Sequence, residues 1–226
     1  MVPPIKPGLP ISSCLRCGTC CKKGGPSFHQ TDKTLIADGV IPSKYLYTIR
    51  AGELAYDNVQ GGLRPVPSDI IKIKAQNRTW TCLFFDEGEN TCRIYPHRPV
   101  ECRALKCWDT REIEGMYAKN RLTRQDLLSN VEGLWNLISN HQARCDCGRI
   151  RDLADALGGE DGGRAQQELR EIIQYDMQIR ELVVSQAKLD PGILDFLLGR
   201  PLIRTIDNYG LQVQRQGKKI RLTKAR

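Results

Sequence analysis

The chain has 226 residues, of which 40% are hydrophobic and 27% are charged, and its formal net charge is +8. No apolar run approaches the roughly 20 residues that a membrane-spanning helix needs, and the proline-rich start has no apolar stretch followed by a cleavage site. We therefore expect no membrane span and no secretory signal. Ten cysteines in such a chain predict a reducing, cytoplasmic location, where thiols stay free unless a metal holds them.

Composition divides the chain into four parts. They are an extended lead-in at 1–11, a cysteine-rich metal-binding region at 12–122, a helical region at 123–199, and a basic hairpin or tail at 200–226. The expected fold class is α+β and mainly helical, in which an irregular metal-binding region with a β-hairpin packs on a helical bundle.

The first predicted elements are a short helix and a strand. Asp32 is placed to cap a helix over residues 33–38. Further along, Ile71 and Ile73 alternate with two lysines, which is the pattern of a half-buried strand.

A β-hairpin is predicted next. Apolar residues alternate from Trp80 to Phe84, Glu87-Gly-Glu-Asn is a plausible turn, and residues 91–95 follow as a return strand. We therefore expect Cys82 and Cys92 on neighbouring strands, with Cys102 on a short helical turn beyond them.

The pattern becomes helical after residue 108. Thr123 and Asp126 have the spacing of a capping box, and residues 127, 131, 134 and 138 form an apolar stripe. Further helices are predicted over 148–157, 164–187 and from Pro191 to about Gly199, the long one burying residues 169, 172, 173, 179, 182 and 183. A terminal hairpin is expected from residues 211–215 and 219–222.

Four cysteines within eight residues are the strongest functional signal: Cys14-Leu-Arg-Cys17-Gly-Thr-Cys20-Cys21. The C-x2-C-x2-C spacing lets one loop supply three thiolates to a cubane cluster, whereas a four-cysteine zinc site more often uses two separated C-x2-C pairs. The spacing favours an iron–sulfur cluster. Because neighbouring side chains diverge, we expect Cys20 and Cys21 not to reach one iron together.

The cysteine pattern also carries a family resemblance. It continues as Cys82-Leu-Phe84, Cys92-Arg-Ile-Tyr95, Arg98-Pro99 and Cys102-Arg103. This order over about residues 12–108 resembles the CxxCxxCC cysteine-cluster proteins, also called YkgJ-type, which are described as zinc- or iron-chelating. The resemblance implies metal chelation. One relative with the same cluster, the flagellin lysine methylase, implies that some members join the site to methyl transfer.

The candidate site residues follow from these patterns. The metal candidates are Cys14, Cys17, Cys20, Cys21, Cys82, Cys92, Cys102 and Cys107. Several thiolates around one cluster leave a net negative charge, which Arg98 and Arg103 would offset, while Tyr95 would shield the site. The alternative for Arg98 is an ion pair with Glu101.

A weaker pattern lies in the helical region. His141-x3-Cys145-x-Cys147 resembles a ligand group, but a histidine near a helix end more often caps carbonyls or faces solvent. A second site that joins Cys102 or Cys107 to Cys145 and Cys147 is a further alternative.

Three functions stay open at this point. The first is a binding or redox protein holding an iron–sulfur cluster, most simply 4Fe-4S, with an electron-transfer or acidic protein as partner. The second is a protein with a structural zinc, and the third is a group-transfer enzyme such as a protein methylase. The basic tail is better explained as a solvated hairpin than as a nucleic-acid contact, since it holds a single aromatic residue, Tyr209.

Overall fold

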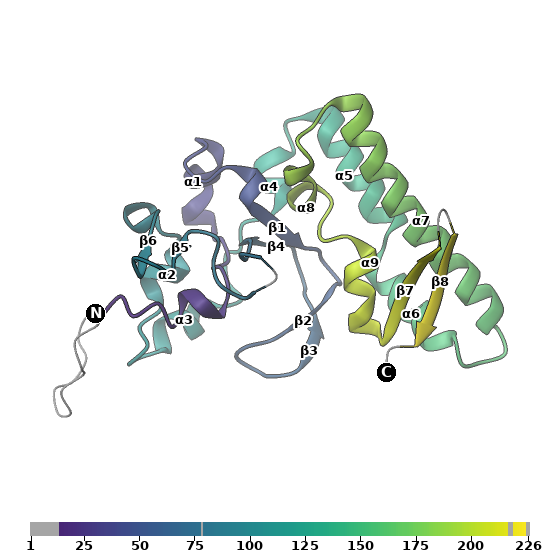
Figure 1. Ribbon diagram of the computed structural model, residues 1–226, viewed down its shortest axis with the longest axis horizontal. Helices are drawn as coiled ribbons and strands as arrows, with labels where there is room; N and C mark the ends of the chain where they lie inside the picture. The colour runs from purple at the N-terminus through teal and green to yellow at the C-terminus, as the bar shows by residue number, and fades with distance from the viewer. Residues whose placement is uncertain (1–13, 78, 217–218, 225–226) are drawn as a thin grey trace.

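The computed structural model describes residues 14–77, 79–216 and 219–224, and it has the α+β, mainly helical class that the sequence predicts (Figure 1). The α-helices are α1 (Lys33–Ala37), α2 (Val100–Ala104), α3 (Arg111–Met116), α4 (Arg124–Leu128), α5 (Glu132–Arg144), α6 (Cys147–Ala156), α7 (Gly162–Ala187), α8 (Leu194–Leu197) and α9 (Leu202–Thr205).

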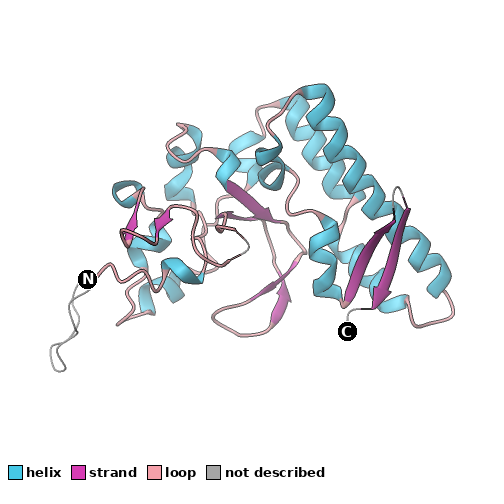
Figure 2. Cartoon of the chain, viewed as in Figure 1, coloured by secondary structure: helices cyan, strands magenta, loops and turns pink. Residues whose placement is uncertain are grey.

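The strands are short and form separate antiparallel pairs (Figure 2). The pairs are β1 (Leu46–Ile49) with β4 (Ile70–Ile73), β2 (Leu54–Tyr56) with β3 (Leu63–Pro65), β5 (Phe85–Asp86) with β6 (Thr91–Cys92), and β7 (Leu211–Gln216) with β8 (Lys219–Lys224). The cysteine-rich elements β5, β6 and α2 lie at one end of the molecule, and α7 with the β7–β8 hairpin lies at the other (Figure 1).

The β1–β4 pair is the centre of the first hydrophobic core. Ile71 and Ile73 are buried, as the alternating pattern predicts, and Leu46 pairs with Ile73. The core also includes Phe196 and its neighbours in α8, although α8 follows β1 by almost 150 residues. Thr48 Oγ1 donates to the Phe196 carbonyl at 2.7 Å. The cysteine-rich and helical parts of the sequence therefore share one core.

A second core lies between α6, α7, α9 and the terminal hairpin. The hairpin forms as predicted, but it is not a solvated tail, because Leu211, Ile220 and Leu222 are buried against Leu169 and Ile173 of α7. Successive side chains of a strand point to opposite faces, so these three side chains lie on the same face of the hairpin.

Four local predictions are corrected by the structure. Asp32 does not cap α1 with its side chain; it is fully buried and accepts from the backbone N–H groups of His29 and Val100 at 3.1 and 2.9 Å. The predicted strand over 80–84 is absent, and Trp80 is 76% exposed. The stripe from residue 127 to 138 is broken between α4 and α5, which leaves Val131 exposed, and Leu182 is exposed on α7.

The predicted helices over 148–157 and 164–187 form as α6 and α7, and the Thr123–Asp126 capping box forms at the start of α4. In the described part of the chain, no helix is both long enough and apolar enough to cross a membrane.

Candidate metal centre

The cysteine loop over residues 14–24 is shaped by two residues with positive φ. Arg16 has φ +52° and Gly18 has φ +76°, and a 3-10 turn at Cys21–Lys23 follows. A β-carbon at Gly18 would overlap the Phe85 ring and lie 2.8 Å from Asn90 Oδ1. The loop backbone therefore packs directly on the β5–β6 hairpin, as only glycine allows.

Two hydrogen bonds tie this loop to the second group of cysteines. The Cys82 backbone N–H donates to the Cys21 carbonyl at 2.7 Å, and Asn90 Nδ2 donates to the Arg16 carbonyl at 2.8 Å. In each of the two hydrogen bonds, the donor and the acceptor residue are more than 60 residues apart in the sequence. The contacts place the C-x2-C-x2-C-C loop beside Cys82 and the β5–β6 hairpin.

The expectation that Cys82 and Cys92 lie on paired strands is half right. Cys92 is in β6 and pairs with Phe85. Cys82 precedes β5 and makes only an isolated bridge to Ala75, and its side chain is buried at 7% exposure. The first strand of the hairpin begins at Phe85, after the predicted strand over 80–84, because the chain turns at residues 82–84.

Cys102 comes from a third segment. Pro99 precedes α2, and the Cys102 backbone N–H donates to the Pro99 carbonyl at 3.0 Å, so the cysteine lies in the first turn, as predicted. Burial first, and then the negative charges of Cys82, Cys92 and Cys20, raise the pKa of the Cys102 thiol.

The thiols of five cysteines, Cys20, Cys21, Cys82, Cys92 and Cys102, lie near enough for their charges to act on one another, and we call them the five-thiol group. Burial and then the charge of Cys92 dominate the raised pKa of Cys82, to which Cys20 also contributes. A hydrogen bond between the two thiols, followed by burial and the charges of Cys20, Cys102 and Cys82, raises the pKa of Cys21.

The side chains of Cys20 and Cys21 converge, contrary to the expectation that neighbouring thiols diverge. The hydrogen bond from Cys21 lowers the pKa of Cys20 to about 6, and the positive charge of Arg98 acts in the same direction. Cys20 is therefore the thiol of the pair that ionises first, as a metal ligand must.

The other three candidate ligands are exposed. Cys17 adjoins the group, because its Sγ lies 3.3 Å from Thr19 Oγ1 and the charge of Cys20 acts on it. Cys14 Sγ accepts from the Arg16 N–H at 3.4 Å at the start of the loop. Cys107 lies in an exposed turn beyond the end of α2, closed by a bridge between Lys106 and Asp109.

The aromatic ring of Tyr95 is covered by two arginines beside the thiols. The guanidinium carbons of Arg98 and Arg16 lie 3.6 and 4.3 Å from the ring centroid. Arg98 Nε is buried and has no hydrogen-bond partner among the described residues. A buried guanidinium N–H without a partner costs free energy, which a further acceptor at this position would offset.

Arg103 and Glu101 act on the protein frame around the thiols. Arg103 donates to the Arg98 carbonyl and lies 3.7 Å from an oxygen of Asp32. Glu101 does not pair with Arg98. Its oxygens lie 2.6 Å from the Ser27 N–H and 3.2 Å from His29 Nε2.

The Glu101 network was missed by sequence reasoning. Glu101 is 7% exposed and also meets Arg121 Nη1 at 3.4 Å. Burial pushes the pKa of Glu101 upward, but the hydrogen bond from His29 and the charge of Lys72 outweigh it, so the pKa is lowered. Its position directly before Cys102 gave no signal, since its partners lie far away in the sequence.

No three of the thiols, all of which lie in described segments, have their sulfurs within 4.8 Å of one another. Among the described residues, one group of three or more potential ligands has its donor atoms within 4.8 Å of one another, and it consists of His141, Cys145 and Asp176. All ten cysteines lie in described segments and are free.

That second group lies in the helical part of the molecule. Cys145 and Cys147 are buried there, and Cys145 belongs to the second core. The structure therefore does not form the alternative site that joins Cys102 or Cys107 to these two cysteines. Burial raises the pKa of Cys145 to about 12 and lowers that of His141.

The aromatic residues that flank Cys82 in the sequence lie in different environments. Trp80 points to solvent, Phe85 is buried, and Phe84 packs edge-to-face on Tyr45 with 5.5 Å between ring centroids. A surface cavity of about 530 Å³ lies elsewhere, between α6 and α7, where Arg149 is already paired with Glu168.

Free thiols from three segments, set beside an arginine with an unpartnered N–H, define a cysteine-cluster domain suited to metal binding. Residues 13–121, a little under half of the chain, match the model of the CxxCxxCC family, which is described as "Putative zinc- or iron-chelating domain". This segment of the chain is similar to that family. Searches of curated proteins and of solved structures found no match.

Proposed function

We propose that the CxxCxxCC domain holds a cysteine-ligated iron–sulfur cluster, most simply 4Fe-4S, with a redox role. The observation that supports the proposal is the five-thiol group itself, in which no three sulfurs of the described residues lie within 4.8 Å of one another. Four thiolates around a single zinc ion, each bound at about 2.3 Å, lie roughly 3.8 Å apart. In a cubane each thiolate binds a different iron, so the sulfurs stand further apart.

The ligands would come from the C-x2-C-x2-C-C loop and the facing segments. Cys20 supplies the thiol with the lowered pKa, Cys17 adjoins it, and Cys82, Cys92 and Cys102 face the loop from the other side. The cluster supplies one-electron transfer when bound. Arg98, held over Tyr95 with Nε unpartnered, stabilises the added negative charge.

The exposed edge of the site suits an acidic partner. Cys14, Cys17 and Cys20 are exposed, and Arg16, Lys22 and Lys23 lie on the same loop. A basic rim at an exposed redox centre attracts an acidic electron-transfer protein, and ten free thiols suit a reducing cytoplasmic location.

The test is anaerobic purification of the full chain with iron, sulfide and zinc analysis and electron paramagnetic resonance. We expect brown protein whose visible absorption bleaches on reduction. Cys20→Ser and Cys102→Ser should lose most of the iron, while Cys147→Ser, in the helical part, should keep it. Colourless wild-type protein with stoichiometric zinc at the five-thiol group would reject the cluster.

A structural zinc is the second candidate, and the sparse packing of the loop favours it. Residues 14–17, 19 and 20 are exposed, and the contacts of the loop include a few hydrogen bonds, the Gly18–Phe85 contact and the Arg16 guanidinium over Tyr95. A metal that closes such a loop contributes folding free energy directly. In that case chelation should unfold the region with no change in visible absorption.

A further inference from the structure

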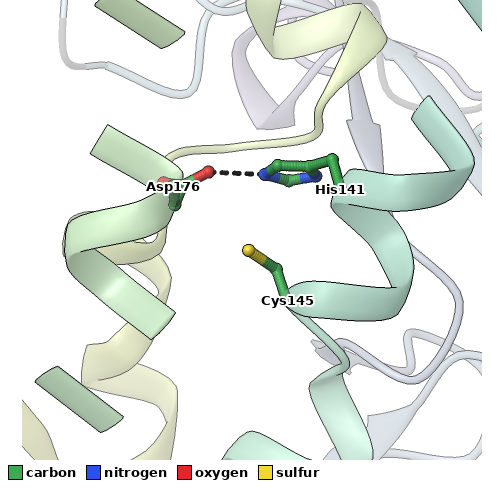
Figure 3. A group of neighbouring side chains, drawn as sticks. All are labelled: His141, Cys145 and Asp176. Carbon is green, nitrogen blue, oxygen red and sulfur yellow. Dashed lines mark hydrogen bonds and ion pairs between the residues drawn. The ribbon is translucent and has the colours of Figure 1, made fainter. Parts of the chain in front are cut away.

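The end of α5 and the middle of α7 bring three potential ligands together (Figure 3), in a part of the chain that contributes no residue to the five-thiol group. His141 and Cys145 are four residues apart, so they lie on the same side of one helical turn. Asp176 faces them from α7. None of the three has any exposed surface, and their donor atoms lie within 4.8 Å of one another.

The hydrogen bonds of Asp176 determine which nitrogen of His141 carries a proton. Asp176 Oδ1 lies 2.8 Å from His141 Nε2 and accepts from Arg180 Nε at 2.9 Å, and Oδ2 accepts from the Leu202 N–H at 2.9 Å. Since a carboxylate only accepts, the proton of a neutral imidazole is on Nε2. His141 Nδ1 is then a bare lone pair.

That lone pair has no partner. His141 Nδ1 is buried and makes no hydrogen bond to any described residue. The two ring nitrogens point in different directions, so an ion that also binds Asp176 must bind Nε2, and the ring proton must then move to the unpartnered Nδ1. The surroundings are otherwise well bonded, because Arg180 donates to Gly199 O at 2.8 Å and Arg50 donates to Cys145 O at 2.8 Å.

The chemistry of the three donors selects the ligand. One imidazole, one thiol and one carboxylate are the set that binds zinc and similar thiophilic ions, whereas magnesium and calcium need oxygen ligands throughout. We propose that His141, Cys145 and Asp176 form a second metal site, specific for a thiophilic divalent cation and separate from the five-thiol group.

Charge in this buried region limits what can bind. The ion displaces the thiol proton of Cys145 to solvent and binds His141 Nε2, whose proton moves to Nδ1, so the buried charge rises by one rather than two. Arg50 and Arg180 oppose a cation, but Asp195 lies 3.7 Å from Arg180, and the charge of Glu53 acts on Arg50. Loss of the thiol proton leaves a thiolate, whose negative charge offsets one of the two positive charges of the ion.

The site lies outside the segment that matches the CxxCxxCC family, which ends at residue 121. It therefore stands or fails independently of the cluster proposed above. It also gives a role to the His141-x3-Cys145 pattern, which helix capping does not explain, since the imidazole is fully buried against α7.

The experiment titrates Zn²⁺ and Co²⁺ into the full chain in which Cys20→Ser and Cys102→Ser remove the first centre. We expect about one equivalent of Co²⁺ to bind, with a thiolate-to-cobalt charge-transfer band in the near ultraviolet. Adding Cys145→Ser should abolish the band, and His141→Gln should weaken binding at least tenfold. Cys147→Ser is the matched control, because its buried thiol lies outside the group, and it should leave binding unchanged.

A second measurement covers failure of the background variant to fold. In the otherwise wild-type chain loaded with zinc, Cys145→Ser should lower the zinc content by one equivalent per chain relative to Cys147→Ser. Equal zinc in those two variants, loss of the cobalt band in both, or no Co²⁺ bound to the folded background variant would each overturn the site.

Discussion

The contact between Gly18 and Phe85 allows a sharp test of how the cysteine loop is held. Gly18→Ala places a β-carbon against the Phe85 ring, which is 2% exposed and cannot move aside easily, and forces alanine to a φ of +76°. The left-handed conformation costs about 1–2 kcal/mol, and overpacking adds about 1–3 kcal/mol. Gly61→Ala is the matched control, with φ +75° and nothing within 4 Å of its β-carbon.

Only the free-energy cost of overpacking against Phe85 should lower the metal affinity. We expect Gly18→Ala to weaken metal binding by the free energy of the clash, about 1–3 kcal/mol, which is roughly 5- to 150-fold. Gly61→Ala should keep wild-type affinity and lose only global stability. The assay is anaerobic competition with a chromophoric chelator, paired with denaturant unfolding of the metal-free chain. Equal metal affinities for the two variants would refute the argument that Phe85 positions the loop.

Two further predictions concern the frame. Leu222→Ala should lower the free energy of unfolding by about 2–5 kcal/mol, because Leu222 is buried in the second core. The control Arg221→Ala changes an exposed neighbour and should stay within about 0.5 kcal/mol of wild type. Similar free energies for the two variants in urea unfolding would show that the hairpin does not contribute to the core. The pKa of Asp126 is lowered because hydrogen bonds from Thr123 and Gln30 outweigh burial, so its carboxylate adds stability above about pH 4. The stability gap between wild type and Asp126→Asn should therefore shrink as pH falls from about 4 to 2, and a constant gap would exclude this carboxylate as the cause.

The parts of the fold that could be predicted are those encoded within a few residues. The Thr123–Asp126 box needs only a three-residue spacing, and Ile71 with Ile73 needs only alternation. Alternation of apolar residues also predicted a strand over residues 80–84, and that prediction was wrong. Alternation there reflects one buried thiol, at Cys82, in a turn bonded to the distant Cys21 carbonyl.

The candidate metal centre could likewise be predicted only where the pattern is local in the sequence. The C-x2-C-x2-C-C spacing and the family resemblance selected the loop and the segments with Cys82, Cys92 and Cys102. They gave no means of ranking the thiols, since the hydrogen bond between Cys20 and Cys21 depends on the turn that the loop adopts. The role of Glu101 could not be predicted either, because its partners, Ser27 and His29, lie far away in the sequence and meet it only in the folded chain.

The two sides of the centre differ in rigidity, and this determines what a bound metal does. Cys102 follows Glu101, whose buried carboxylate is fixed by Ser27 and His29 before any metal binds. Cys14 and Cys17 are exposed, and their contacts are local hydrogen bonds within the loop. A preorganised side lowers the entropic cost of binding, whereas a loosely held side loses conformational freedom only when the ion or cluster is captured. Metal binding therefore orders the loop against a frame that is already in place, and loss of metal should increase hydrogen exchange in residues 14–24 while sparing α2.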